Sequence, residues 1–197
     1  MPHLDLENRQ FIFKIVYFGP GMSGKTTNLL YIHRTLMEKY RGDMLVLDTE
    51  EERTLFFDFF PVSLGTVQGF SLKFHLYTIP GQVYYEASRR IILEGADGVV
   101  FVADSNTERL DDNLEMYRRM LDNLESYGVD PGSFPIVLQY NKRDFDDILP
   151  LGTLEEALEL PDRIPVTSSV ATTGRGVMQT LKIISKEVIR QFQPTAV

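Results

Sequence analysis

Eight residues near the N-terminus, GPGMSGKT at positions 19–26, have the residue types and spacing of a loop that binds phosphate. They match the P-loop pattern G-x-x-x-x-G-K-[ST], in which glycines let the backbone turn its N–H groups toward a polyphosphate. Lys25 would reach the β- and γ-phosphates, and the hydroxyl of Thr26 would be a ligand of Mg²⁺. The residues expected to surround the phosphates are Gly19, Gly21, Met22, Ser23, Gly24, Lys25, Thr26 and Thr27.

The segments on either side of this loop support the same interpretation. Residues 11–18 (FIFKIVYF) are β-branched and aromatic, which predicts a buried strand, and residues 25–40 carry apolar side chains at helical spacing. The phosphates would therefore lie at the N-terminus of a helix, where free N–H groups and the helix dipole favour an anion. The alternative, a glycine-rich turn that matches by chance, is disfavoured by this strand and helix.

A second polar group, NKRD at 141–144, directly follows an apolar strand predicted over 134–141. A carboxylate can accept two parallel hydrogen bonds from the N1–H and the exocyclic amino group of guanine, a pair of donors that adenine lacks. We therefore expect Asp144 to select guanine. Asn141 would bond the N7 edge of the base or tie this loop to the P-loop, and the aliphatic stem of Lys142 would cover the face of the base.

Strands and helices alternate along the whole chain, which predicts an α/β fold with a mostly parallel central sheet and helices on both faces. We expect residues 1–197 to form a single domain. Ligands of such sheets bind at the carboxyl ends of strands, where both motifs lie. The predicted strands are 11–18, 45–48, 72–78, 98–105, 134–141 and 164–168, an aromatic run at 55–60 is typical of a core strand, and the predicted helices are 82–93, 107–127, 153–159 and 177–192 in addition to 25–40.

Composition excludes several classes of function. With 20 basic and 28 acidic residues the net charge is −8, which disfavours nonspecific binding to nucleic acid. The chain has no cysteine, so thiol catalysis, thiolate metal sites, prenylation and palmitoylation are excluded, and its three histidines lack zinc-ligand spacing. Pro2 stands where N-myristoylation needs glycine, and no apolar run approaches about 18 residues. We expect a cytoplasmic protein without a lipid anchor or an integral membrane segment.

With both motifs in order on one predicted sheet, the chain resembles the Ras-like small GTPases over nearly its full length. The resemblance implies the three-layer P-loop NTPase fold of small G proteins, with GTP or GDP and Mg²⁺ as ligands. The last base-binding segment of that family, usually S-A-K, corresponds to Val170-Ala171-Thr172. There the N–H of Ala171 would contact O6 of guanine, and Val170 would line the same segment.

The D-x-x-G element of the family corresponds to Thr78-Ile79-Pro80-Gly81, followed by Gln82. The resemblance implies that the Gly81 N–H binds the γ-phosphate and that Gln82 orients the attacking water. Thr78 stands where the family has an aspartate that accepts a hydrogen bond from Mg²⁺-bound water, so the surroundings of the metal must be built differently. The candidates to replace this aspartate are Asp48, Asp58 and Asp104.

The strings TIPGQVYYEASRR (78–90) and ERTLFFDFF (52–60) narrow the resemblance to the bacterial MglA group, which sets cell polarity for gliding and related motility. That group has threonine at the position of Thr78 and an arginine before the switch threonine, here Arg53 and Thr54. The resemblance implies that Thr54 and Thr26 both ligate Mg²⁺ and that Arg53 is an arginine finger supplied in cis. It also implies an MglB-type roadblock protein as activator and polarity or motility proteins as effectors.

The function expected from these residues is a switch that hydrolyses GTP to GDP and phosphate, slowly until a partner orders Arg53 and Gln82. A nucleotide-locked scaffold, which binds GTP or GDP with negligible hydrolysis, is the alternative that Thr78 suggests. A P-loop kinase or ATPase is disfavoured because Asp144 does not suit adenine.

Overall fold

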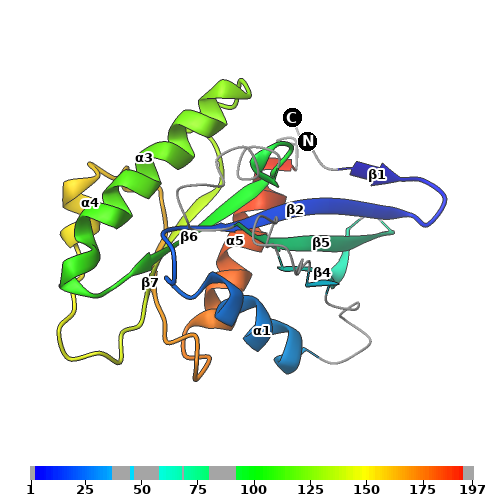
Figure 1. Cartoon of the computed structure of the whole chain (residues 1–197). Helices are drawn as coiled ribbons and strands as arrows, with labels where there is room; N and C mark the ends of the chain where they lie inside the picture. The colour runs from blue at the N-terminus through cyan, green and yellow to red at the C-terminus, as the bar shows by residue number, and fades with distance from the viewer. Residues whose placement is uncertain (1–2, 37–44, 47–57, 68, 80–91, 193–197) are drawn as a thin grey trace, which may run out of the picture.

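The computed structural model describes residues 3–36, 45–46, 58–67, 69–79 and 92–192. Their centre is an eight-stranded sheet (Figure 1). The strands are β1 (His3–Asp5), β2 (Gln10–Phe18), β3 (Leu45–Val46), β4 (Asp58–Val67), β5 (Phe70–Thr78), β6 (Gly98–Asp104), β7 (Ile136–Asn141) and β8 (Val166–Ser168).

The sheet is mostly parallel, as the alternation of strands and helices predicts. Its order is β3-β4-β5-β2-β6-β7-β8, and β1 pairs antiparallel with the first residues of β2. The strands β5, β2, β6, β7 and β8 are parallel to their neighbours in that order, whereas β3 and β4 form an antiparallel edge beside β5. The carboxyl ends of β2, β6 and β7 therefore point to the same side of the sheet.

Helices cover both faces of this sheet, which confirms the three-layer arrangement. They are α1 (Lys25–Thr35), α3 (Leu110–Ser126), α4 (Thr153–Ala157) and α5 (Val177–Phe192), and a short 3₁₀ turn, η3 (Thr107–Arg109), precedes α3. One core cluster joins the sheet to α3 and α4 through Met116, Met120 and Leu154. The other joins the opposite face to α1 and α5 through Leu29 and Ile184.

The central strands are apolar along their whole length because both of their faces are buried. Every residue of β6 (GVVFVAD) and of β7 (IVLQYN) is buried. In β5 burial alternates, with Leu72, Phe74 and Leu76 buried in the core beneath α1 and α5. The polar residues at the ends of β6 and β7, Asp104 and Asn141, are thus brought to the same edge of the sheet.

Two predicted elements have clearly different bounds in the structure, several others differ by one to three residues, and one strand is missed. The first helix ends at Thr35 and not at residue 40, because Leu36 has extended backbone angles (φ −72°, ψ 140°). The strand expected over 55–60 instead spans Asp58–Val67 and contains a register shift between Ser63 and Thr66, and β1 was not predicted. The helix expected after Gly81 lies outside the described residues except for its last positions, Ile92 and Leu93.

Within the part of the chain that the structure describes, no helix has both the length and the apolar character needed to cross a lipid bilayer.

Candidate nucleotide-binding site

Asn141 joins three loops at the carboxyl edge of the sheet. Its Nδ2 donates to the carbonyl oxygen of Ser23 in the P-loop (2.8 Å). Its Oδ1 accepts from the hydroxyl of Ser169 (2.9 Å) and from the N–H of Ala171 (3.0 Å), both in the loop between β8 and α5. Of the two roles that the sequence left open for Asn141, this structure shows the tie to the P-loop.

The P-loop turns where only glycine fits. Gly19 has φ +146° and Gly24 has φ +97°, a region of backbone conformation that residues with side chains rarely adopt. A Cβ atom on Gly19 would collide with the carbonyl oxygen of Val102, and a Cβ atom on Gly24 would collide with Nδ2 of Asn141. The two glycines therefore let the loop pass close to β6 and to the base-binding loop.

The N-terminus of α1 is suited to bind an anion. Gly24 is its N-cap, no side chain caps it, and the first turn contains no acidic residue. The N–H groups of this turn and the helix dipole thus favour a phosphate. The hydroxyl of Thr26 is exposed here, where it offers Mg²⁺ an oxygen ligand of the kind this ion prefers, and Thr27 is half-buried beside it.

Lys25 places a positive charge inside the P-loop. The residue is only 6% exposed, and its Nζ donates to the carbonyl oxygens of Gly19 (3.0 Å) and Pro20 (2.7 Å). Burying an ammonium group costs free energy unless it is hydrogen-bonded and paired with an anion. The two carbonyls hold the ammonium in place beside the loop that is expected to surround the phosphates.

A cavity of about 130 Å³ lies between the P-loop and the base-binding loop. Asp144 is exposed at this cavity, where its carboxylate can meet the edge of a base, and Lys142 lies next to it. The residues lining the cavity include Met22, Thr27, Asp144, Phe145, Ala171 and Thr172. The structure therefore brings the predicted phosphate-binding and base-binding residues together in one place.

Phe145 is a lining residue that sequence reasoning missed. Its side chain is 49% exposed, and the Nζ of Lys142 lies 5.7 Å from the centre of its ring. Its position directly after the polar run 141–144 was the available signal. Phe145 can pack against a base that enters the cavity.

The segment after β8 is held closely against the base-binding loop. Val170 and Ala171 are buried, and the N–H of Val170 donates to the carbonyl oxygen of Arg175 (2.9 Å). The N–H of Ala171, expected to contact guanine O6, donates to Asn141 in this structure. A contact with O6 would therefore share this donor between the base and Asn141.

Of the three acids considered as replacements at Thr78, the structure assigns Asp104 another role. The carboxylate of Asp104 is buried and accepts from Nζ of Lys142 (2.7 Å), so it belongs to the base-binding side. Thr78 itself is 3% exposed at the end of β5. The side chain of Asp58 is not described, and Asp48 lies outside the described residues. Among the described residues, no cluster of three or more His, Asp or Glu side chains could hold a metal ion.

The predicted catalytic segments cannot be compared with the structure. Arg53, Thr54, Gly81 and Gln82 all lie outside the described residues, and their roles stay predictions.

A larger cavity, of about 490 Å³, lies at the opposite end of the strands. Phe13, Phe134, Val188 and Phe192 line it, and it contains none of the motif residues. The smaller of these two cavities is the better candidate site because it joins residues of the P-loop to a carboxylate that can bind a base.

The chain is similar to known small GTP-binding proteins. A model of the ADP-ribosylation factor family matches residues 3–188. The mutual gliding-motility protein MglA of Myxococcus xanthus is 47% identical over 193 residues, which cover 98% of each chain. More distant similarity extends to human ADP-ribosylation factor-like protein 4C, 24% identical over 90% of this chain and 87% of the human protein. The Ras-related protein RABG3f of Arabidopsis thaliana is 24% identical over 92% of this chain and 84% of the plant protein.

Proposed function

The chain belongs to the ADP-ribosylation factor family and, within it, to the MglA group of Ras-like small GTPases, and we propose that it is a switch that controls cell polarity or motility. As a member of this family it is a GTP-binding protein that hydrolyses GTP to GDP and phosphate.

The observation that carries the proposal is the hydrogen bond from Asn141 to the carbonyl of Ser23. This bond holds the base-binding loop against the P-loop, and Gly24 and Thr27 of the P-loop line the same cavity as Asp144. A guanine nucleotide would lie with its base against Asp144 and its phosphates at the N-terminus of α1.

Within this site each residue has a distinct chemical task. Lys25 neutralises charge on the β- and γ-phosphates, and the hydroxyls of Thr26 and Thr54 hold Mg²⁺. When bound, the ion supplies further neutralisation of phosphate charge. Arg53 neutralises the charge that develops on the transferring oxygens, and Gln82 orients the attacking water.

The same phosphate contacts give the switch its two states. While the γ-phosphate is present, the N–H of Gly81 and the backbone of Thr54 bind it, and hydrolysis removes this anchor from both segments. Because hydrolysis removes these contacts, the rate of hydrolysis sets the lifetime of the GTP-bound state.

An activator of the MglB roadblock type and cytoplasmic polarity or motility effectors complete the proposal. This part rests on the likeness to the Myxococcus xanthus protein, whose name refers to gliding motility. In this scheme the activator repositions Arg53 and Gln82 and contributes no arginine of its own.

A multiple-turnover phosphate-release assay with GTP and Mg²⁺, with and without an MglB-type roadblock protein, tests the proposal. We expect slow release that the partner accelerates. Tight GTP and GDP binding without any stimulation would support the nucleotide-locked scaffold instead. Competition of ATP with GTP for the binding site at similar concentrations would support a P-loop kinase or ATPase instead.

Lys25→Ala tests the nucleotide site and should abolish the binding of GTP and GDP. Lys14→Ala is its matched variant, because Lys14 also donates through Nζ to a backbone carbonyl, that of Glu94 (2.8 Å), on a different part of the protein. Retention of tight GTP binding by Lys25→Ala would contradict the assignment of the P-loop.

A further inference from the structure

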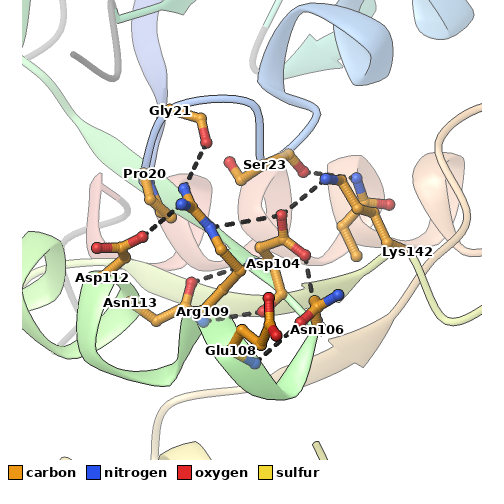
Figure 2. Close-up of polar contacts among 12 residues, drawn as sticks. Pro20, Gly21, Ser23, Asp104, Asn106, Glu108, Arg109, Asp112, Asn113 and Lys142 are labelled. Atoms are coloured by element: carbon orange, nitrogen blue, oxygen red, sulfur yellow. Dashed lines mark hydrogen bonds and ion pairs between the residues drawn. The ribbon is translucent and has the colours of Figure 1, made fainter. Parts of the chain in front are cut away.

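Two charged residues that no motif includes connect the P-loop to the base-binding loop (Figure 2). Nη2 of Arg109, at the end of η3, donates to the carbonyl oxygen of Gly21 in the P-loop (2.9 Å). Nη1 of the same arginine forms an ion pair with Asp112 (2.5 Å), and its Nε lies 4.0 Å from Oδ2 of Asp104. Nζ of Lys142 lies 2.7 Å from that same oxygen of Asp104. Asp104 thus stands between a cation that contacts the P-loop and a cation of the base-binding loop.

The carboxylate of Asp104 is held in a fixed position. The residue is 2% exposed, so its charge is stable only when paired and hydrogen-bonded. Asn113 of α3 bonds both backbone groups of Asp104, accepting from its N–H (3.0 Å) and donating to its carbonyl oxygen (2.8 Å). The N–H of Asn106 donates to Oδ1 (3.1 Å), which leaves Oδ2 for the two cations.

Lys142 depends on this anchor. Its backbone has φ +65°, in the left-handed region that costs free energy for residues other than glycine. The ion pair with Asp104 fixes the end of its side chain, so the aliphatic stem stays beside the cavity that Asp144 and Phe145 line. Without the carboxylate, the ammonium end of the Lys142 side chain would lose this restraint.

We propose that Asp104 and Arg109 are positioning residues that fasten the tip of the P-loop to the base-binding loop and thereby slow the release of bound nucleotide. The connection runs Gly21–Arg109–Asp104–Lys142 and is separate from the uncharged tie between Asn141 and Ser23. It rests on the proposed function, because it acts on the same guanine nucleotide. Asp144 is not part of it, so selection of guanine should not depend on it.

The test measures the dissociation rate of a fluorescent GDP analogue from the full chain in the presence of Mg²⁺. Asp104→Asn and Arg109→Gln should each release the analogue roughly 10- to 100-fold faster, the range expected when a hydrogen bond to a charged group is lost. The double variant should be little faster than Asp104→Asn alone, because the two residues act as one unit. Arg109→Lys, which keeps the charge beside Asp104, should bring the rate partway back to that of the wild type.

Arg119→Gln is the matched control. It breaks an arginine–carboxylate pair within α3, Arg119 with Glu115 (2.7 Å), and neither residue lines the nucleotide cavity. Its release rate should equal that of the wild type, and the melting temperature of each variant shows whether it is folded. If Asp104→Asn does not fold, Arg109→Gln decides, because the side chain of Arg109 is already 36% exposed.

If the folded variants release the analogue at the wild-type rate, the proposed role of Asp104 and Arg109 is wrong. The proposed function would still stand in that case, because the wild type binds GDP. Equal acceleration in Arg119→Gln would also overturn it, because the effect would then be a general loosening of α3. Failure of the wild type to bind GDP at all would overturn the proposed function and, with it, this inference.

Discussion

The side-chain amide of Asn141 occupies the space in which Gly24 would carry a Cβ atom. The base-binding loop and the P-loop therefore approach each other at a residue that has no side chain, and the shape of each loop depends on the other. This contact links the end of β7 to the start of α1, segments that are more than a hundred residues apart in the chain.

Gly24→Ala should abolish nucleotide binding. The added methyl group would push Asn141 away from Ser23, and alanine is strained at φ +97°. Gly152→Ala is the matched control, because Gly152 is also a helix N-cap, has φ +96° and has open space around its Cβ position. Titration with a fluorescent GDP analogue should show loss of binding only in Gly24→Ala; equal affinity in both variants would contradict the close approach.

Asp144→Asn should shift the preference from guanine toward xanthine nucleotides. An asparagine presents a donor where the carboxylate accepted, which suits the exocyclic oxygen of xanthine. Competition of XTP and GTP for the site measures this change. Asp146→Asn, an exposed residue of the same loop, is the control and should keep GTP selectivity; preserved selectivity in Asp144→Asn would argue against its role at the base.

Arg53→Ala and Gln82→Leu should each slow GTP hydrolysis while leaving nucleotide affinity unchanged. Loss of an arginine finger lowers turnover by about 10³- to 10⁵-fold in related switches, and loss of water orientation acts on the same step. Single-turnover hydrolysis in the presence of the activator separates chemistry from binding. A variant with the wild-type rate would remove that residue from the mechanism.

Thr180→Val should destabilise the fold by about 1–3 kcal/mol. The hydroxyl of Thr180 in α5 accepts from Nε2 of the buried Gln139 (3.0 Å) and lies 2.9 Å from the hydroxyl of Thr167. Gln139 also donates to Asn28 of α1 (3.2 Å), so the loss would affect a network that crosses the core.

The control for this network is Ser185→Ala on the same helix. Ser185 is buried too, but its hydroxyl has no hydrogen-bond partner among the described residues. Its removal should therefore leave the free energy of unfolding nearly unchanged. Urea denaturation compares the two variants, and equal losses would show that the network contributes nothing beyond packing.

His75 should make the protein less stable in mild acid. Burial, reinforced by the positive charge of Lys73, lowers the pKa of His75 to about 4 in the folded protein, whereas an unfolded histidine has a pKa of about 6.5. Between these values the unfolded chain binds more protons, so the free energy of unfolding falls as the pH drops from about 6.5 to about 4. His75→Gln should show a smaller fall in urea denaturations across this window; an identical fall would refute the assignment.

The sequence alone determined the class of fold and the chemistry of the ligand. Fully apolar runs such as 98–103 must be buried on both faces, which requires helices on both sides of a mostly parallel sheet, and α5 lies at its predicted residues 177–192. Local patterns were less informative at the first helix, because the extended conformation of Leu36 that ends it has no signal in the spacing of apolar residues. That residues 1–197 form one domain remains a prediction.

Only the tertiary structure decided how the two motifs contact each other. Sequence spacing left two roles open for Asn141, and the pairing of β6 with both β2 and β7 placed its amide against Ser23. It likewise paired Asp104 with Lys142 and Arg109 with Gly21, which no local pattern could reveal. The type of a residue determines which hydrogen bonds and ion pairs its side chain can form. The residue with which it forms them depends on which strand ends meet at the edge of the sheet.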